Sequence, residues 1–321
     1  MTPSSEPIHE PVKAPPRLDF AIVGQPKSGT TALAQFLSEH PQIAFSVPKE
    51  SAYFATDFHR ESDAFHGRQV YFNYRTPQDF KALFEHADEG QLLGEGSTSS
   101  LYSVEAAQNL HAHNPEMKII AMFRDPVAMI HALHTQYVNE TVEDLDFEAA
   151  IAAEDERAAG RMVPSRVRSP SYVLYGRRTA YTDQLRRFED LFGPRQILNV
   201  LSEEFRDDNA GTFASVAGFL GIDPEFQPDF RTVHGSQTAR SGFLNRALNQ
   251  PRFKNRLSSW LGPRRYTALR DRVAGAVFKS SSRPEIDPTL DAALRKRFKA
   301  EVVRFGEHIG RDLSTIWHGY V

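Results

Sequence analysis

The chain has 321 residues, of which 40% are hydrophobic and 25% are charged, and it contains no cysteine. This composition allows a packed core, and it excludes disulfides, thiolate metal sites and a thiol nucleophile. A formal net charge of −3 gives no global signal for a nucleic-acid partner, so none is expected. The lack of cysteine fits a reducing cytoplasm, where we expect the protein to be located.

Residues 1–17 are expected to form a flexible leader. Proline and acidic residues stand there in place of the basic start and apolar run of a signal peptide. No apolar run approaches the roughly 20 residues that a membrane span requires, so no transmembrane segment is expected. The rest, 18–321, is expected to be a single domain, with a basic, helical C-terminal part over 235–321.

Three short apolar runs predict buried parallel strands. They are LDFAIVG at 18–24, KIIAMF at 118–123 and QILNVLS at 196–202, and each precedes a helical pattern of apolar residues. The helix after the third run is expected to end at Gly221, and an amphipathic C-terminal helix is expected to end at Gly310. Strands that alternate with helices predict an α/β fold with a mostly parallel sheet, whose ligand lies at the carboxyl ends of the strands.

The segment GQPKSGTT at 24–31 has the glycine spacing of a nucleotide-binding loop. A nucleoside triphosphatase needs lysine directly after the second glycine, but Thr30 follows Gly29 here and the lysine is Lys27, inside the loop. Backbone N–H groups at a turn from strand to helix form an anion cradle, which suits Gly29 and the small hydroxyl residues Ser28, Thr30 and Thr31. The alternative is a tight turn with Thr30 capping the helix.

The strand at 118–123 runs directly into Arg124, whose planar guanidinium binds phosphate bidentately. A ligand held by Lys27 and Arg124 without a metal indicates a nucleotide that carries phosphates at two places. The histidines show no metal-binding spacing such as H-E-x-x-H, so no metal is expected.

With these residues the chain resembles the PAPS-dependent sulfotransferases, whose donor is 3′-phosphoadenosine 5′-phosphosulfate (PAPS). The likeness rests on PKSGTTAL at 26–33 and FRDPV at 123–127, and it continues through GEGSTSSLY at 94–102, residues 181–208 and FLGIDP at 219–224. It is strongest to bacterial members near the carbohydrate-sulfotransferase branch. The resemblance implies a P-loop-type three-layer fold and transfer of a sulfuryl group to a hydroxyl of a sugar, lipid or secondary metabolite.

The resemblance also implies roles for the loop residues and Arg124. Lys27 contacts the 5′-phosphate and the oxygen that bridges it to sulfur, Arg124 binds the 3′-phosphate, and the remaining loop contacts to the 5′-phosphate come from Ser28, Gly29, Thr30 and Thr31. The family usually places a serine eight residues after the arginine, where this chain has Ala132. Either one hydroxyl is missing, or one of three neighbours replaces it: His131, His134 or Thr135.

In the same comparison Glu50, within VPKESAYF, matches an acid that precedes an aromatic pair and takes the acceptor proton. The neighbouring Lys49 either orients Glu50 or holds the sulfuryl group, and the alternative is an exposed ion pair in a loop. Glu95, at a strand end, is a second candidate base. Many relatives have lysine after this glutamate, whereas this chain has Gly96, which leaves less positive charge facing the acceptor.

The C-terminal part offers further candidates. Arg240, Ser241 and Gly242 fall where the family closes a loop over the 3′-phosphate and adenine, and Tyr181 either stacks on adenine or belongs to the core. The basic stretch 252–272 is either an amphipathic helix pair with a solvated face or a surface for an anionic acceptor, carrier protein or lipid headgroup.

Two other functions remain open from the sequence. One is a P-loop kinase with an aberrant loop, against which the position of Lys27 and the missing Mg²⁺ ligands argue. The other is a regulatory module that binds the nucleotide without catalysis, which Ala132 keeps open.

Overall fold

The structure is a computed structural model that describes residues 16–230 and 285–320, together with the backbone of 238–239 and 278–279. Its centre is a five-stranded sheet in the order β2-β3-β1-β4-β5, in which every pair is parallel. The strands are β1 (Phe20–Gly24), β2 (Ile43–Phe45), β3 (Leu92–Glu95), β4 (Lys118–Phe123) and β5 (Ile197–Leu201). Residues 238–239 and 278–279 form a separate antiparallel pair, β6 and β7.

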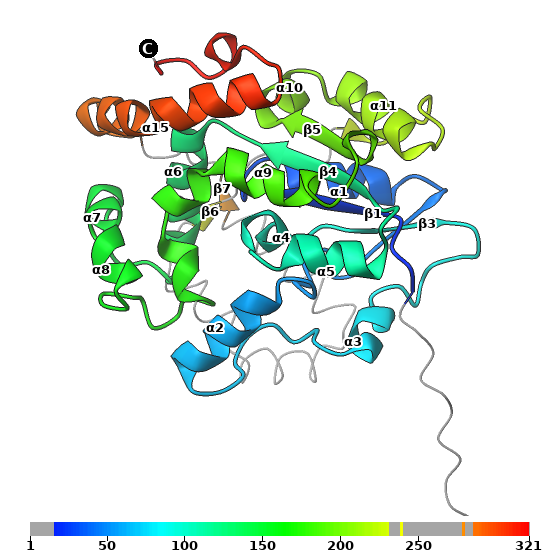
Figure 1. Ribbon diagram of the computed structural model, residues 1–321, viewed down its shortest axis with the longest axis horizontal. Helices are drawn as coiled ribbons and strands as arrows, with labels where there is room; N and C mark the ends of the chain where they lie inside the picture. Colours follow the sequence, from blue (N-terminus) through cyan, green and yellow to red (C-terminus); the bar gives the residue numbers. More distant parts are fainter. Residues whose placement is uncertain (1–15, 231–237, 240–277, 280–284, 321) are drawn as a thin grey trace, which may run out of the picture.

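Helices cover both faces of the sheet, because alternate side chains of each buried strand point to opposite sides. Phe20 and Ile22 of β1 pack against one set of helices, while Ala21 and Val23 pack against another. The first set is α1 (Thr30–Ser38), α10 (Ser202–Asp207) and α11 (Asn209–Leu220). The second includes α4 (Ser99–Tyr102), α5 (Ala106–His113), α6 (Pro126–Asn139), α9 (Tyr181–Glu189) and α15 (Pro288–His308). Figure 1 shows the resulting three layers, which confirm the expected fold.

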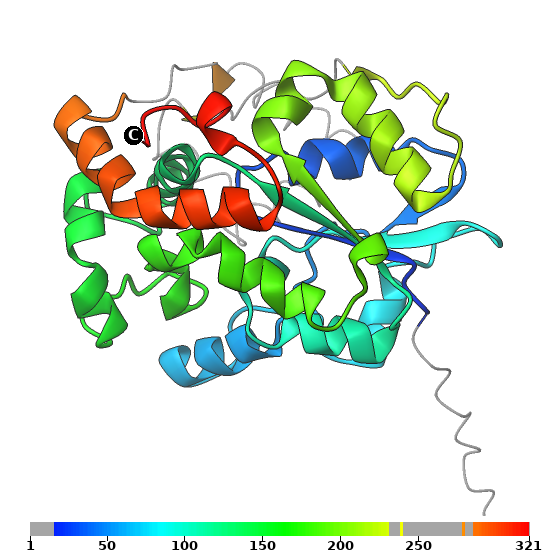
Figure 2. The ribbon, with the colours of Figure 1, turned by 45° about the horizontal axis from the view of Figure 1, so that its top comes forward.

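The remaining helices surround this second set. They are α2 (Thr56–His66), α3 (Pro77–Ala82), α7 (Phe147–Ala152) and α8 (Glu154–Ala158), with the short 3₁₀ turns η1 (Pro170–Val173), η2 (Gly176–Thr179), η3 (Pro194–Gln196) and η5 (Leu313–Thr315). Figure 2 shows α15 lying across α6 and α9, with the C-terminal segment on the same side. No helix in the described ranges is both long and apolar enough to cross a bilayer.

Most of the predicted element boundaries agree with the structure. β4 has the bounds predicted for it, α11 ends at Gly221 in a left-handed conformation, and α15 ends two residues before Gly310. The suggestion that Thr30 caps α1 is wrong, because Gly29 is the N-cap residue and no side chain caps the helix. Arg17 pairs with Glu116, so the folded part begins before residue 18, while the division into leader and single domain stays a prediction.

Candidate functional site

The loop between β1 and α1 has a backbone that suits an anion. Gly29 is left-handed, with φ of 91°, a conformation that favours glycine. A Cβ there would also lie 3.0 Å from Cδ1 of Phe205, so both the backbone conformation and the packing require glycine. Lys27 is also left-handed, with φ of 64°, which is uncommon for a side-chain-bearing residue and concentrates at functional sites. Left-handed residues within a short turn are typical of the concave nests of N–H groups that bind phosphate.

Ser28 gives a test of whether the loop fits phosphate. Its side chain is completely buried, and its hydroxyl has no hydrogen-bond partner among the residues that the structure describes. Buried hydroxyls are almost always partnered, and an anionic oxygen in the loop would supply the partner. The donor set therefore fits a phosphate group.

The carboxyl end of β4 places Arg124 beside this loop, because β4 pairs directly with β1. Nη1 of Arg124 donates to the carbonyl oxygen of Lys27 over 2.8 Å, so the structure brings the two predicted phosphate ligands together. The hydroxyl of Tyr181 donates to the Arg124 carbonyl over 2.9 Å, and its buried ring packs on Phe123 and Phe305. Tyr181 therefore belongs to the core, where it supports the strand end.

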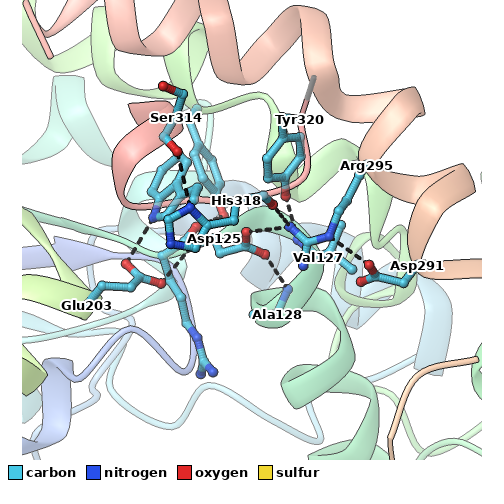
Figure 3. A network of polar contacts seen from close by, with 12 residues as sticks. Asp125, Val127, Ala128, Glu203, Asp291, Arg295, Ser314, His318 and Tyr320 are labelled. Carbon is cyan, nitrogen blue, oxygen red and sulfur yellow. Dashed lines mark hydrogen bonds and ion pairs between the residues drawn. The ribbon is translucent and has the colours of Figure 1, made fainter. Parts of the chain in front are cut away.

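The turn after Arg124 is held by a polar network that Figure 3 shows. The carboxylate of Asp125 caps α6 by accepting from the Ala128 N–H over 2.8 Å, and it forms an ion pair with Arg295 of α15 at 3.0 Å. Arg295 also pairs with Asp291 at 2.7 Å and donates to the carbonyl oxygen of His318. The start of α6 is thus fixed by α15 and by the segment that follows it.

Two further contacts join the same turn to the C-terminal segment (Figure 3). One oxygen of Glu203 accepts from the Asp125 N–H over 3.1 Å, and the other accepts from Nε1 of Trp317 over 3.0 Å. The hydroxyl of Tyr320 accepts from the Val127 N–H over 3.4 Å. These contacts leave the backbone around Arg124 little freedom to move.

On the other side of the loop lies the predicted base. The side chain of Glu50 is 45% exposed, accepts from Lys49 Nζ over 2.9 Å and lies 3.4 Å from the hydroxyl of Thr98. Nζ of Lys49 is also 3.3 Å from the hydroxyl of Thr30. Lys49 therefore joins the carboxylate of Glu50 to the phosphate loop.

Lys49 also lies close to Gly96. A Cβ at Gly96 would lie 3.2 Å from Cε of Lys49 and 3.0 Å from the ring of Phe45, so the lysine side chain covers the space above this glycine. A positive charge from the segment after β2 thus stands near Gly96, while the charge that faces the acceptor stays a prediction. Sequence reasoning missed this because the two residues meet only through the pairing of β2 with β3.

Glu95 is placed differently from Glu50. It is completely buried and accepts from the hydroxyl of Ser51 over 3.2 Å and from the N–H and hydroxyl of Ser97. Burial raises the pKa of Glu95 to about 7, against the lowering effect of Ser97 and the charge of Lys49. Since Ser97 Oγ also accepts from the N–H of the residue after Ser51, Glu95 anchors the chain that carries Glu50.

The neighbours of Ala132 on α6 already have partners inside the protein. Ala132 itself is buried, Nε2 of His134 lies 2.9 Å from the carbonyl oxygen of Leu145, and the Thr135 hydroxyl donates to the His131 carbonyl over 2.8 Å. His134 and Thr135 therefore serve local structure, and a substitute for the usual serine stays a prediction.

Several predicted contacts lie outside the described residues: Arg240, Ser241, Gly242 and the basic stretch 252–272. Within the ranges that the structure does describe, no group of three or more histidine, aspartate or glutamate side chains is arranged to hold a metal ion.

Comparison with known proteins agrees with this site. A profile of the sulfotransferase family matches residues 19–228. Human heparan sulfate glucosamine 3-O-sulfotransferase 3A1 is 25% identical over 298 residues, which are 93% of this chain and 62% of that protein. Human bifunctional heparan sulfate N-deacetylase/N-sulfotransferase 3 is 26% identical over 211 residues, 64% of this chain and 22% of that protein. A sulfotransferase structure from Alicyclobacillus acidocaldarius superposes with a TM-score of 0.58 at 25% identity, covering 79% of this chain and 96% of that one.

Proposed function

This chain belongs to the sulfotransferase family, and on that premise we propose that it transfers a sulfuryl group from PAPS to a hydroxyl of a sugar, lipid or secondary metabolite. The observation that carries the proposal is the arrangement at the strand ends. Nη1 of Arg124 lies 2.8 Å from the carbonyl oxygen of Lys27 there, and Lys49 contacts both Glu50 and Thr30 of the same loop. A sugar is the preferred acceptor, because the names of the two human relatives refer to heparan sulfate, and the 3-O-sulfotransferase, which matches 93% of this chain, favours a hydroxyl.

The donor supplies an activated sulfuryl group, and the loop and β4 hold its two phosphorylated ends. The N–H groups from Ser28 to Thr31, together with Lys27, bind the 5′-phosphate, and Arg124 binds the 3′-phosphate. Lys27 further stabilises the negative charge that forms on the phosphate oxygen as its bond to sulfur breaks. Arg240, Ser241 and Gly242 stay predictions for the adenine side.

Glu50 takes the proton of the acceptor hydroxyl while the hydroxyl oxygen forms the new bond to sulfur. Its 45% exposure suits contact with a substrate, whereas Glu95 is sealed inside the protein and supports the segment from behind. Lys49 orients Glu50 and places positive charge between the base and the loop. The cytoplasmic location and the absence of a metal requirement stay predictions.

The proposal is tested by calorimetric titration of adenosine 3′,5′-bisphosphate, the spent donor, without magnesium. We expect micromolar binding to the wild type and to Glu50→Gln, and loss of binding in Lys27→Ala and Arg124→Ala. Glu50→Gln should retain the nucleotide yet lose about 10²- to 10⁴-fold in sulfuryl transfer, the usual contribution of a general base.

The other outcomes separate the alternatives. No binding to the wild type would contradict the donor assignment, and strict dependence on ATP and Mg²⁺ would indicate a kinase. Binding without turnover on a broad panel of hydroxyl acceptors would indicate a regulatory module.

A further inference from the structure

Arg178, in the turn η2, is a buried cation next to the proposed active site. Only 3% of the residue is exposed, and its guanidinium carbon lies 4.5 Å from the ring centre of Tyr102 and 4.8 Å from that of Tyr172. Stacking on two aromatic rings fixes the plane of the guanidinium group. Because the plane of the group is fixed, its two terminal nitrogens point in one direction, as bidentate recognition of an oxyanion requires.

The charge of Arg178 is not balanced within the described part of the chain. Its hydrogen bond there is a long one, 3.4 Å from Nε to the Tyr172 carbonyl, and it forms no ion pair with a described carboxylate. Arg157 shows the contrast, since it is equally buried and is paired with Glu143 at 2.7 Å. Neither terminal nitrogen of Arg178 donates a hydrogen bond to a described residue.

Unpaired buried charge is costly, and proteins retain it chiefly where a ligand completes the pair. The terminal nitrogens of Arg178, which have no hydrogen-bond partner among the described residues, favour such a ligand.

The position of Arg178 links it to Glu50. Thr98, whose hydroxyl lies 3.4 Å from the carboxylate of Glu50, directly precedes α4. Tyr102, at the other end of α4, is the second ring that covers Arg178. The short helix α4 therefore spans from the base to the arginine.

Tyr137 lies within reach of both charges. Burial raises the pKa of Tyr137, the charge of Arg178 lowers it, and the charges of Glu140 and Glu50 add to the rise. Both charges thus act on the same hydroxyl, that of Tyr137.

The surroundings add positive charge. Arg168 lowers the pKa of both Tyr137 and Tyr172, which burial raises, and Arg177 acts in the same sense on Tyr102. Two carboxylates that act on Tyr102 have other partners, since Glu61 accepts from two serines and Glu154 pairs with Arg297 at 2.7 Å. Around this group of tyrosines Arg168 and Arg177 therefore add to the positive charge of Arg178.

We propose that Arg178 binds a carboxylate or sulfate group of the acceptor, and that this enzyme therefore sulfates an anionic substrate. The proposal rests on the proposed function and names the acceptor class for it. Arg178 acts as a specificity-determining residue: it holds the anionic group while Glu50 receives the hydroxyl proton elsewhere on the same molecule.

The test uses the full chain saturated with adenosine 3′,5′-bisphosphate, so that the two phosphate sites of the donor are occupied, and sulfate bound at the vacant sulfuryl position is the same in every variant of Arg178. Inorganic sulfate, p-nitrophenyl β-D-glucuronide and the matching uncharged glucuronamide are titrated calorimetrically into wild type, Arg178→Gln and Arg178→Lys. Arg161→Gln is the matched control, because Arg161 is an exposed arginine paired with Glu156.

We expect the wild type to bind the glucuronide about tenfold more tightly than the amide, the change that one charge-assisted hydrogen bond carries. Arg178→Gln should lose this preference and bind sulfate about tenfold more weakly. Arg178→Lys should keep part of both effects, and Arg161→Gln should match the wild type.

Equal affinity of the wild type for both sugars, no sulfate binding to it, or a preference that survives Arg178→Gln would overturn the proposal. Unchanged bisphosphate binding reports that a variant is folded, and if Arg178→Gln is not folded then Arg178→Lys decides. Failure of the wild type to bind bisphosphate would contradict the donor site instead. In that case the sulfate affinities of wild type and Arg178→Gln, compared without nucleotide, decide about Arg178.

Discussion

Replacing Glu95 with glutamine gives a sharp test of the electrostatics behind the active site. Glu95 is completely buried, and burial raises its pKa from 4.5 to about 7. Between these two pH values the folded protein binds the proton more tightly than the unfolded chain does. The stabilisation from this group is therefore fully present below pH 4.5 and is lost as the pH rises through 7. The difference in pKa corresponds to about 3 kcal/mol of unfolding free energy.

The assay is urea unfolding of wild type and Glu95→Gln at pH 5 and pH 8. Subtracting the two proteins at each pH cancels every other titrating group. The difference should shift by about 2.5 kcal/mol in favour of the variant at the higher pH, because part of the stabilisation is already lost at pH 5. Glu89→Gln, at an exposed position, is the control and should show no such shift. A Glu95→Gln difference that is the same at both pH values would refute the reasoning.

Three other substitutions, with Gly67→Ala as a control, test the phosphate loop, a buried ion pair and the support of α6. Gly29→Ala should lower the unfolding free energy by about 1–3 kcal/mol in urea, because φ is 91° and the new Cβ meets a ring carbon of α10 at 3.0 Å. Gly67→Ala, with φ of 67° and open space around it, shows how much of the loss is backbone strain alone. Glu143→Gln leaves Arg157 buried without its partner and should cost about 3–5 kcal/mol, so an unchanged melting temperature would contradict the pairing. Arg295→Met removes the ion pair to the carboxylate that caps α6, and we expect weaker bisphosphate binding, measured by calorimetry, in a protein that is still folded.

How far the sequence predicts the structure differs between strands and loops. The bounds of β4 were predictable because a fully apolar run stands between Lys118 and Arg124, and a buried parallel strand demands that pattern. Lys27 and Arg124 were found by motif, and the pairing of β1 with β4 explains why they meet.

The supports of the base were not predictable from the sequence. Ser51 and Ser97 look like ordinary loop serines. Ser97 follows Glu95 by two residues, but only the pairing of β2 with β3 brings Ser51 to the buried carboxylate of Glu95. The same holds for Lys49, whose place over Gly96 depends on packing between two strand ends. Short polar contacts between distant loops leave no periodic signal in a sequence.

The contacts of Asp125 with Arg295 and of Val127 with Tyr320 affect how the protein folds during synthesis. The phosphate loop and Arg124 leave the ribosome before α15, but the turn that follows Arg124 is tied to Arg295 and Tyr320, which are 170 and 193 residues away from their partners. Contacts between such distant residues form late in folding, since a long loop must close first. The donor site is thus completed only after α15 and Tyr320 have been made, and a nascent chain that already has its sheet still lacks a rigid seat for the nucleotide.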